Sequence, residues 1–288
     1  MSTLEAPPVR LSVPPVDEVE DLHGDPAHHD LALFMHGNQW MVMDVLLQEF
    51  QALRPEVASV YYQTLPPGIL VRQMTQGALS VGELLIRVSP DVLTADVSTL
   101  AQLAEEEWLE DYYEYAGNTL AILVPRSNPQ GVQGWADLLR PEVRVALPDP
   151  EIEGLGRLVR EAIVDTLGND AWSQLVEGRR QEGLAVFTQI HHRETPLWLL
   201  AGEVDAGPVW LTEALYQRRL NLPLDVVRLP ADQNRQGRYA VAVVGRTTTH
   251  PEAAQAFVAF LRGPAAQSIY ADYGFEVAVG ARARLQEL

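Results

Sequence analysis

Two residue types, cysteine and lysine, are absent from this chain of 288 residues. Without cysteine the chain can form no disulfide, no thiolate metal site and no cysteine nucleophile. All 21 basic side chains other than histidine are arginine, which also excludes a Schiff-base lysine and the lysine of a P-loop. We attribute the missing lysine to coding bias rather than to function.

Long apolar runs and common catalytic motifs are missing as well. No stretch approaches the roughly 18 uninterrupted apolar residues of a membrane helix, so we expect no membrane insertion. The chain contains no G-x-S-x-G, G-x-G-x-x-G or Walker motif, and therefore gives no support for a serine hydrolase or for nucleotide binding. We expect no enzyme activity and no cofactor, although a hydrolase using the carboxylates of Glu151 and Glu153 stays open.

The composition is that of a globular protein, with 47% hydrophobic and 21% charged residues and a length that suits two domains. The net charge of −18 argues against binding to nucleic acid or to anionic membranes. A small anion can still bind, because helix dipoles and single arginines act locally while the wider field is screened.

Residues 1–30 are rich in proline and acidic side chains and show no helical or strand period. They predict a flexible or loosely packed acidic N-terminal arm. They do not form a signal peptide, because a basic start and an apolar core are missing. We therefore expect a cytoplasmic protein if Met1 is the native start, and an extracytoplasmic or periplasmic one if a leader has been removed.

From Leu31 onward short apolar strands alternate with amphipathic helices, which is typical of an α/β fold. The continuous apolar runs at 118–125 and 239–244 predict strands that are buried on both faces. The other strands are expected at 31–35, 57–62, 90–94, 143–147, 185–187 and 206–210, and helices at 41–53, 69–76, 97–105, 135–139, 155–163, 172–176, 196–201, 251–261 and 264–273.

The segment from His191 to Trp210 combines a helix start with a short strand. Thr195 is a suitable N-cap, Pro196 suits the first helical position, and Gly202 follows where the helix should end. Backbone amides at such a helix start, with Arg193 just before it, can hold a negatively charged ligand. A salt bridge of Arg193 with Glu194 or with a core acid is the other interpretation.

Four expected strands end in a turn that begins a helix, at 36–38, 64–68, 149–154 and 193–196. Ligands of open α/β sheets bind beyond the carboxyl ends of the strands, where such turns gather. Several helix starts in one place present unpaired N–H groups, which suit an anion.

Motifs in a fixed order carry a family resemblance. The last part of the chain reads HPEAA at 250–254, FVAFL at 257–261, Gly263-Pro264 and YGF at 273–275; earlier motifs are NTLAILVP at 118–125, DLL at 137–139, Asp149-Pro150 and GEVDAGPVWLTEA at 202–214. Over about 31–275 the chain resembles type II periplasmic-type solute-binding proteins of ABC importers, nearest the molybdate/tungstate-binding branch.

The resemblance implies a two-lobed α/β fold, in which each lobe is a mixed sheet flanked by helices and two crossover strands join the lobes. Residues 31–119 and 225–288 would form lobe 1 and residues 120–224 lobe 2, with crossovers at 120–124 and 240–244. A small, anionic solute would be captured in the interlobe cleft, which closes on it. We expect a monomer that serves ABC-type uptake together with a permease.

The resemblance also implies the ligand contacts, and these depart from the molybdate pattern. Molybdate binders of this kind offer small hydroxyl residues at the first two turns and a tyrosine at the last position. This chain has His36-Gly37-Asn38 at the first turn, Thr64-Leu65-Pro66-Pro67 at the second, where the prolines lack an N–H, and Trp210 at the last position. We therefore expect an oxyanion such as molybdate, tungstate or sulfate, or a small carboxylate, as the ligand of a divergent site. The implied contacts are His36, Gly37, Asn38, Thr64, Pro67, Gly68, Glu151, Glu153, Gly154, Arg193, Glu194, Thr195 and Trp210.

Two further functions stay open from the sequence. The first is a cytoplasmic ligand sensor or accessory protein with the same fold, which the missing signal peptide favours. The second is a metal-dependent enzyme that uses His36, one of His191 and His192, and a nearby carboxylate.

Overall fold

The computed structural model describes residues 9–11, 20–151, 153–189, 193–277 and 282–283. The chain divides into two compact units, of which unit 2 holds residues 118–237 and unit 1 holds the described residues before and after that stretch. The chain passes from one unit to the other within two strands, β8 (Tyr112–Pro125) and β13 (Gln236–Val243). The lobe limits expected from the sequence lie at 119/120 and 224/225. The second limit differs because β12 (Leu224–Arg228) pairs with β8 at Ala121 to Pro125, inside unit 2.

Unit 1 is built on a mixed sheet in which β3 (Leu31–Phe34) has a parallel neighbour on each side. All four residues of β3 are buried, which explains their continuous apolar sequence. The order of strands is β13, β7 (Val92–Asp96), β3, β4 (Val60–Gln63) and β2 (Leu22–His23), and the two outer strands of this set are antiparallel to their neighbours.

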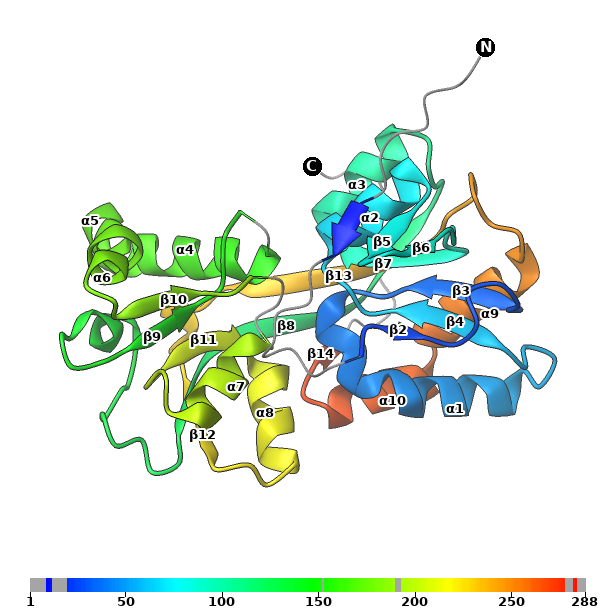
Figure 1. Ribbon diagram of the computed structural model, residues 1–288. Coiled ribbons are helices and arrows are strands. Elements are labelled where there is room, and N and C mark those ends of the chain that lie inside the picture. The colour runs from blue at the N-terminus through cyan, green and yellow to red at the C-terminus, as the bar shows by residue number, and fades with distance from the viewer. Residues whose placement is uncertain (1–8, 12–19, 152, 190–192, 278–281, 284–288) are drawn as a thin grey trace, which may run out of the picture. The chain divides into compact units, whose positions relative to one another are not determined.

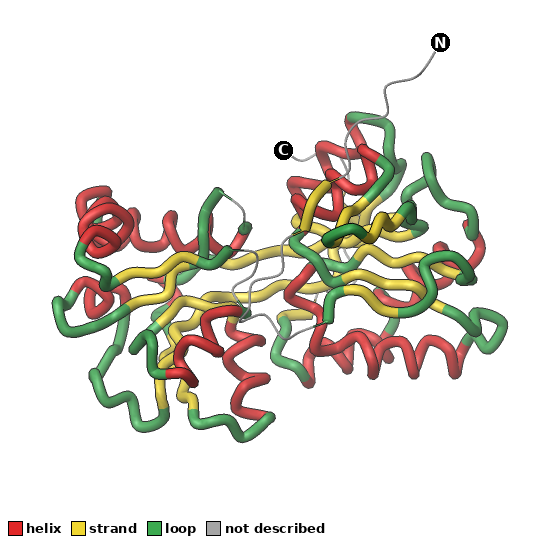
Figure 2. Tube along the Cα trace, in the orientation of Figure 1, coloured by secondary structure: helices red, strands yellow, loops and turns green. Residues whose placement is uncertain are grey.

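Helices cover both faces of this sheet (Figures 1 and 2). Phe50 packs edge-on against Phe257 with ring centroids 5.0 Å apart, which joins the helices of one face. Those helices are α1 (Met43–Leu53), α9 (Pro251–Leu261) and α10 (Pro264–Asp272), and the other face carries α2 (Pro67–Gln76) and α3 (Val97–Glu105).

Short strands complete unit 1, and two of them lie within residues 1–30. Of that region, Val9–Leu11 forms β1, which pairs with β5 (Leu79–Val81), and Leu22–His23 forms β2, which pairs with β4. The ring of His23 stacks on Tyr62 at 4.3 Å. Strands of two or three residues are too short to show a period of two, so the sequence pattern missed them. The remaining strands are β6 (Leu84–Ile86), paired with β5, and β14 (Glu276–Val277) and β15 (Arg282–Ala283), paired with β8.

Unit 2 contains two sets of strands. The second half of β8 pairs antiparallel with β11 (Gly207–Trp210) and with β12, and β9 (Val145–Leu147) pairs parallel with β10 (Ala185–Phe187). The helices are α4 (Gly154–Leu167), α5 (Asn169–Ser173), α6 (Arg179–Gln181), α7 (Glu194–Ala201) and α8 (Leu211–Arg219), with a π-helical turn at Gln174–Gly178 and 3-10 turns at Trp135–Leu139 and Ala231–Gln233.

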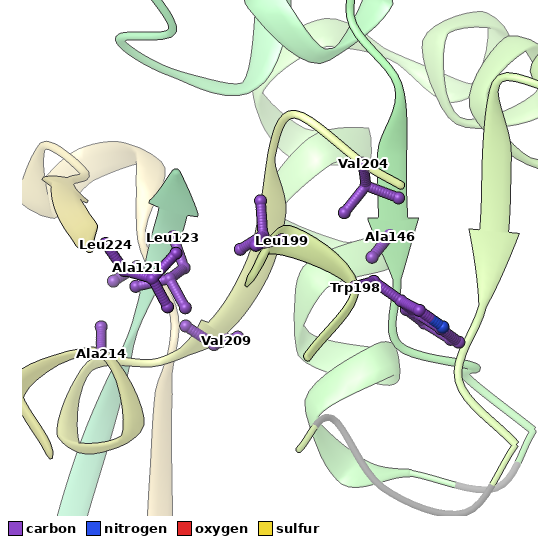
Figure 3. Close-up of a cluster of buried hydrophobic side chains, with 9 residues drawn as sticks. All are labelled: Ala121, Leu123, Ala146, Trp198, Leu199, Val204, Val209, Ala214 and Leu224. Atoms are coloured by element: carbon purple, nitrogen blue, oxygen red, sulfur yellow. The ribbon is translucent and has the colours of Figure 1, made fainter. Parts of the chain in front are cut away.

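One apolar cluster joins α7 to the strands of unit 2 (Figure 3). Trp198 and Leu199 of α7 pack with residues of β8, β9 and β11, and α8 and β12 close the cluster from the other side. Because α7 is fixed by this burial, the start of the helix is held against the strands. The members are Ala121, Leu123, Ala146, Trp198, Leu199, Val204, Val209, Ala214 and Leu224.

Most expected elements are present, and several bounds coincide, as for 97–105, 135–139, 185–187 and 251–261. The N-cap predicted at Thr195 is wrong. Helix α7 begins at Glu194, so Thr195 lies inside its first turn. Arg193, the residue before the helix, already has a helical backbone with φ −64° and ψ −16° and makes no side-chain capping bond. The predicted end is correct, since Gly202 stops α7 with φ +72°. Among the helices described, none is both long enough and apolar enough to cross a bilayer.

Candidate functional site

In unit 1 the predicted contacts follow the carboxyl ends of β3 and β4, which lie at the same edge of the sheet because the strands are parallel. The amide of Met35 donates to the carbonyl of Gln63 at 2.8 Å and continues the pairing past the end of β3. The next amide, of His36, donates to the hydroxyl of Thr94 on β7 at 2.7 Å. Three adjacent strands thus fix the point where the chain leaves the sheet.

The first predicted turn forms a 3-10 turn (Gly37–Val42) that runs into α1. His36 caps this turn, since its Nδ1 accepts a hydrogen bond from the amide of Asn38 at 3.3 Å. The Nε2 of the same ring therefore carries the proton and lies 3.7 Å from the carboxylate of Asp96. The side-chain amide of Asn38 donates to the hydroxyl of Tyr239 at 2.6 Å, and the ring of Tyr239 meets His36 edge-on at 4.8 Å.

The second predicted turn is held against the first. A Cβ on Gly37 would lie 3.1 Å from the carbonyl oxygen of Thr64, so a larger residue would push the two turns apart by a few tenths of an ångström. Thr64 is buried, and its amide donates to the carbonyl of Asp21 at 3.0 Å. Pro67 and Gly68 begin α2; Pro67 supplies no N–H, while Gly68 faces open space.

A buried hydrogen-bonded set lies directly behind the first turn. Gln39 donates to the hydroxyl of Tyr115 and accepts from the hydroxyl of Tyr270, the latter at 2.8 Å. Complete burial raises the pKa of both tyrosines above the ordinary value of a phenol, so both stay neutral hydrogen-bonding groups. The set ties α10 and β8 to the residue that follows Asn38.

Asp91 anchors the opposite end of the same strands. Burial alone raises the pKa of this carboxylate, but hydrogen bonds from the amides of Ala32 and Thr249 and from His250 outweigh it and lower the pKa below its usual value. Asp91 is 1% exposed, so the ionised carboxylate is held inside unit 1 by its donors.

In unit 2 the first predicted loop follows β9. Gly156, in the first turn of α4, lets this loop lie close to the helix, since a Cβ at position 156 would be 2.6 Å from the carbonyl carbon of Asp149. Glu151 is exposed, and its amide donates to the carboxylate of Asp149 at 2.8 Å. Glu153 is buried as the residue before α4 and accepts a hydrogen bond from the hydroxyl of Thr188, and Gly154 is the first residue of that helix.

The second predicted turn of unit 2 is the start of α7, where Arg193, Glu194 and Thr195 are all buried. The carboxylate of Glu194 accepts from the amide of Gln189 at 2.7 Å, so it occupies an amide donor of the preceding loop. The hydroxyl of Thr195 is buried and has no hydrogen-bond partner among the described residues. The methyl of Thr195 lies against Gly207, where a Cβ would be only 2.4 Å from it.

Trp210 is the last residue of β11 and is paired with Leu120 of β8. It is 1% exposed, so its indole is part of the packed interior of unit 2. Beside this pair, the side-chain amide of Asn118 donates to the hydroxyl of Thr212 at 2.8 Å, which fixes the start of α8.

Within each unit, then, most of the predicted residues lie at strand ends and helix starts. In unit 1 the turn 36–38 contacts Thr64, and in unit 2 Thr195 packs against the first residue of the strand that ends in Trp210. Their role as ligand contacts stays a prediction. Four residues that hold these positions in place were not predicted from the sequence: Thr94, Tyr239, Thr188 and Gly207. Of these, only Gly207 lies in a motif that the sequence showed, GEVDAG.

The residues proposed for a metal-dependent enzyme are not brought together in the part of the chain that the structure describes. His191 and His192 lie outside the described residues. Among the described histidines and carboxylates, no group of three or more is arranged to hold a metal ion.

Comparisons with known proteins agree with this architecture. A sequence profile of the family described as "Bacterial extracellular solute-binding protein" matches residues 31–276. The molybdate-binding protein ModA of Mycobacterium tuberculosis is 28% identical over 230 residues, covering 79% of this chain and 77% of the relative. YvgL of Bacillus subtilis, named as an ABC transporter substrate-binding lipoprotein, is 25% identical over 209 residues, covering 72% of each chain.

Among solved structures, the sulfate-binding protein SubI of Mycobacterium tuberculosis superposes with a TM-score of 0.71 at 22% identity, covering 86% of each chain. A likeness at that identity shows the fold, and it confirms the expected type II α/β architecture with helices flanking mixed sheets. The resemblance to the molybdate-binding branch is confirmed by the relatives. The chain belongs to the family of bacterial extracellular solute-binding proteins.

Proposed function

We propose that this protein is the extracytoplasmic solute-binding component of an ABC importer and that it captures a small anion. The family match carries the proposal, and the names of the relatives support it, since they bind molybdate or sulfate or are named for ABC transport. The family description also favours the extracytoplasmic location over a cytoplasmic sensor. A monomer remains part of the proposal.

The local geometry supports an anion as the ligand. In unit 1 the turn 36–38 and the start of α2 both follow strand ends, and in unit 2 the starts of α4 and α7 do so. Helix starts carry partial positive charge, which stabilises a negative charge. Thr195 adds a buried hydroxyl that can donate to such a ligand.

The test is a binding screen by thermal shift and titration calorimetry with molybdate, tungstate, sulfate, phosphate and small carboxylates, with chloride as control. A ligand at 100 times its Kd stabilises the folded protein by about 2.7 kcal/mol. We expect at least one of the anions to do so. If none stabilises the protein at millimolar concentration, the proposal is wrong.

A matched pair of variants then tests the role of unit 2. Thr195→Val removes the unpartnered hydroxyl and keeps the side-chain shape, so it should weaken anion binding by about tenfold. Thr166→Val is the control, because the hydroxyl of Thr166 bonds to the carbonyl of Ala162 within α4. Equal affinity in both variants would remove Thr195 from the proposed site.

A further inference from the structure

The hydrogen-bonding groups around Asn38 indicate which class of anion this protein binds. This inference rests on the proposed function. Asn38 is fully buried, in the first turn of the helix that follows β3. Its side-chain nitrogen is bonded to Tyr239, which leaves the oxygen to face elsewhere. That oxygen, Oδ1, is buried and accepts no hydrogen bond within the described part of the chain.

Three backbone amides at this turn already have acceptors within the protein. The amide of His36 is bonded to Thr94 at 2.7 Å, that of Asn38 to His36 Nδ1 at 3.3 Å, and that of Gln39 to the carbonyl of His36 at 2.9 Å. The neighbouring turn adds few, because residues 66 and 67 are prolines and have no N–H. The turn thus offers an acceptor without a donor, the side-chain oxygen of Asn38, while three of its amides are already hydrogen-bonded.

Unit 2, taken by itself, shows a similar emphasis on acceptors. The residue before α4 is Glu153 and the first residue of α7 is Glu194, and both carboxylates are buried. Glu194 uses a loop amide as its donor, and Asp149 uses the amide of Glu151. Carboxylates at these positions compete with an added anion for the same amides.

A fully ionised oxyanion such as sulfate or molybdate presents only acceptors. Placed against Asn38 Oδ1 it would bring two acceptors together and leave a buried carbonyl oxygen unsatisfied, which is unfavourable. A ligand with an O–H or N–H group satisfies that oxygen while its negative charge still meets the helix start. We infer that the ligand is an anion that also donates a hydrogen bond to Asn38, namely a protonated oxyanion or a small carboxylate bearing a hydroxyl or amino group.

The experiment compares matched anions on the purified protein by calorimetry at pH 6. Phosphate, protonated at that pH, is compared with sulfate and molybdate, and lactate is compared with propionate, which lacks only the hydroxyl. We expect the donor-bearing member of one pair to bind about ten- to a hundredfold more tightly. Sulfate, molybdate or propionate binding as tightly as its partner in each pair would overturn the inference and leave the proposed function intact. Absence of binding by any anion would overturn both.

Asn38→Asp tests the orientation of the amide. If Asn38 accepts from the ligand, a carboxylate there also accepts, so the variant keeps the donor-bearing ligand and discriminates more strongly against sulfate. If Asn38 instead donated to the ligand, the variant would lose binding altogether, which would contradict the inference. Gln73→Glu is the matched control, because Gln73 of α2 also has a buried, unpartnered side-chain oxygen but lies beyond the first turns of its helix. Its ligand preference should equal that of the unmodified protein.

Discussion

Gly207 is the position where a single methyl group should disturb the start of α7 most directly. A Cβ built there lies 2.4 Å from the methyl of Thr195, 3.1 Å from the carbonyl oxygen of Ala146 and 3.2 Å from its Cβ. A contact of 2.4 Å between carbon atoms cannot persist, and the opposing groups belong to the backbone of β9 and to a helix fixed by the Trp198 cluster. Strand β11 and helix α7 must therefore move apart.

We expect Gly207→Ala to lower the free energy of unfolding by about 2 kcal/mol, within the usual range for overpacking. That loss corresponds to a fall in Tm of roughly 4–8 °C for a protein of this size. Calorimetry of the purified variant measures it. Gly178→Ala is the matched control in unit 2, because its Cβ would meet only a side-chain carbon at 3.7 Å and φ is −61°, so stability should be unchanged or rise by up to about 1 kcal/mol.

Thr195→Ser, combined with Gly207→Ala, forms a double-mutant cycle, because the serine lacks the clashing methyl and keeps the hydroxyl. The double variant should be more stable than the sum of the two single changes predicts, by about 1 kcal/mol. Strict additivity, or a Gly207→Ala protein as stable as the original, would refute the argument that Gly207 exists to admit Thr195.

Three further changes test other parts of the fold. Gly156→Ala places a carbon 2.6 Å from Asp149 and should lower stability by about 2 kcal/mol in urea unfolding; an unchanged midpoint would contradict the close approach. Asp91 has a lowered pKa in the folded state, so the stability it contributes is present above about pH 4, its unfolded pKa, and is lost as the pH falls through the folded value. Asp91→Asn should therefore lower Tm at pH 7 and flatten its fall in acid; parallel profiles would exclude this role. Arg179 is 2% exposed and donates to the carbonyl of Val143. Arg179→Met leaves that carbonyl without its donor and should lower the free energy of unfolding by about 2 kcal/mol, measured by circular dichroism. An unchanged free energy of unfolding would mean that water replaces the donor.

Much of the fold was predictable from long segments in which apolar residues are continuous or repeat at a regular spacing, and from residues that end an element. The strand 31–34 and the helix 97–105 are apolar or amphipathic over their whole length, and Gly202 needs its positive φ, so each is visible in the sequence. Helix α8 and strand β12 were not predicted: α8 has no clear apolar face, and β12 is a short edge partner of β8.

The candidate site was predictable in its positions and not in its interactions. The turns at 36–38 and 193–196 followed from strand-to-helix boundaries. The partners of Asn38 and His36 are Tyr239 and Thr94, which lie 201 and 58 residues away along the chain, so no local pattern could pair them. The same holds for the hydroxyl of Thr188 on Glu153, which only the parallel pairing of β9 and β10 brings close.

The passage of β8 and β13 between the units has a consequence for the order in which the chain folds. The described residues of unit 2 come from one stretch, 118–237, so β11, β12 and α7 can meet as soon as that stretch is available. Unit 1 joins residues from before and after that stretch. Strand β7 cannot pair with β13, and Phe50 cannot pack against Phe257, until the later part of the chain is available. Contacts that close such long loops form late. During synthesis, unit 2 should therefore reach its native packing first, while the unit that contains Asn38 stays incomplete until α9 and α10 have followed.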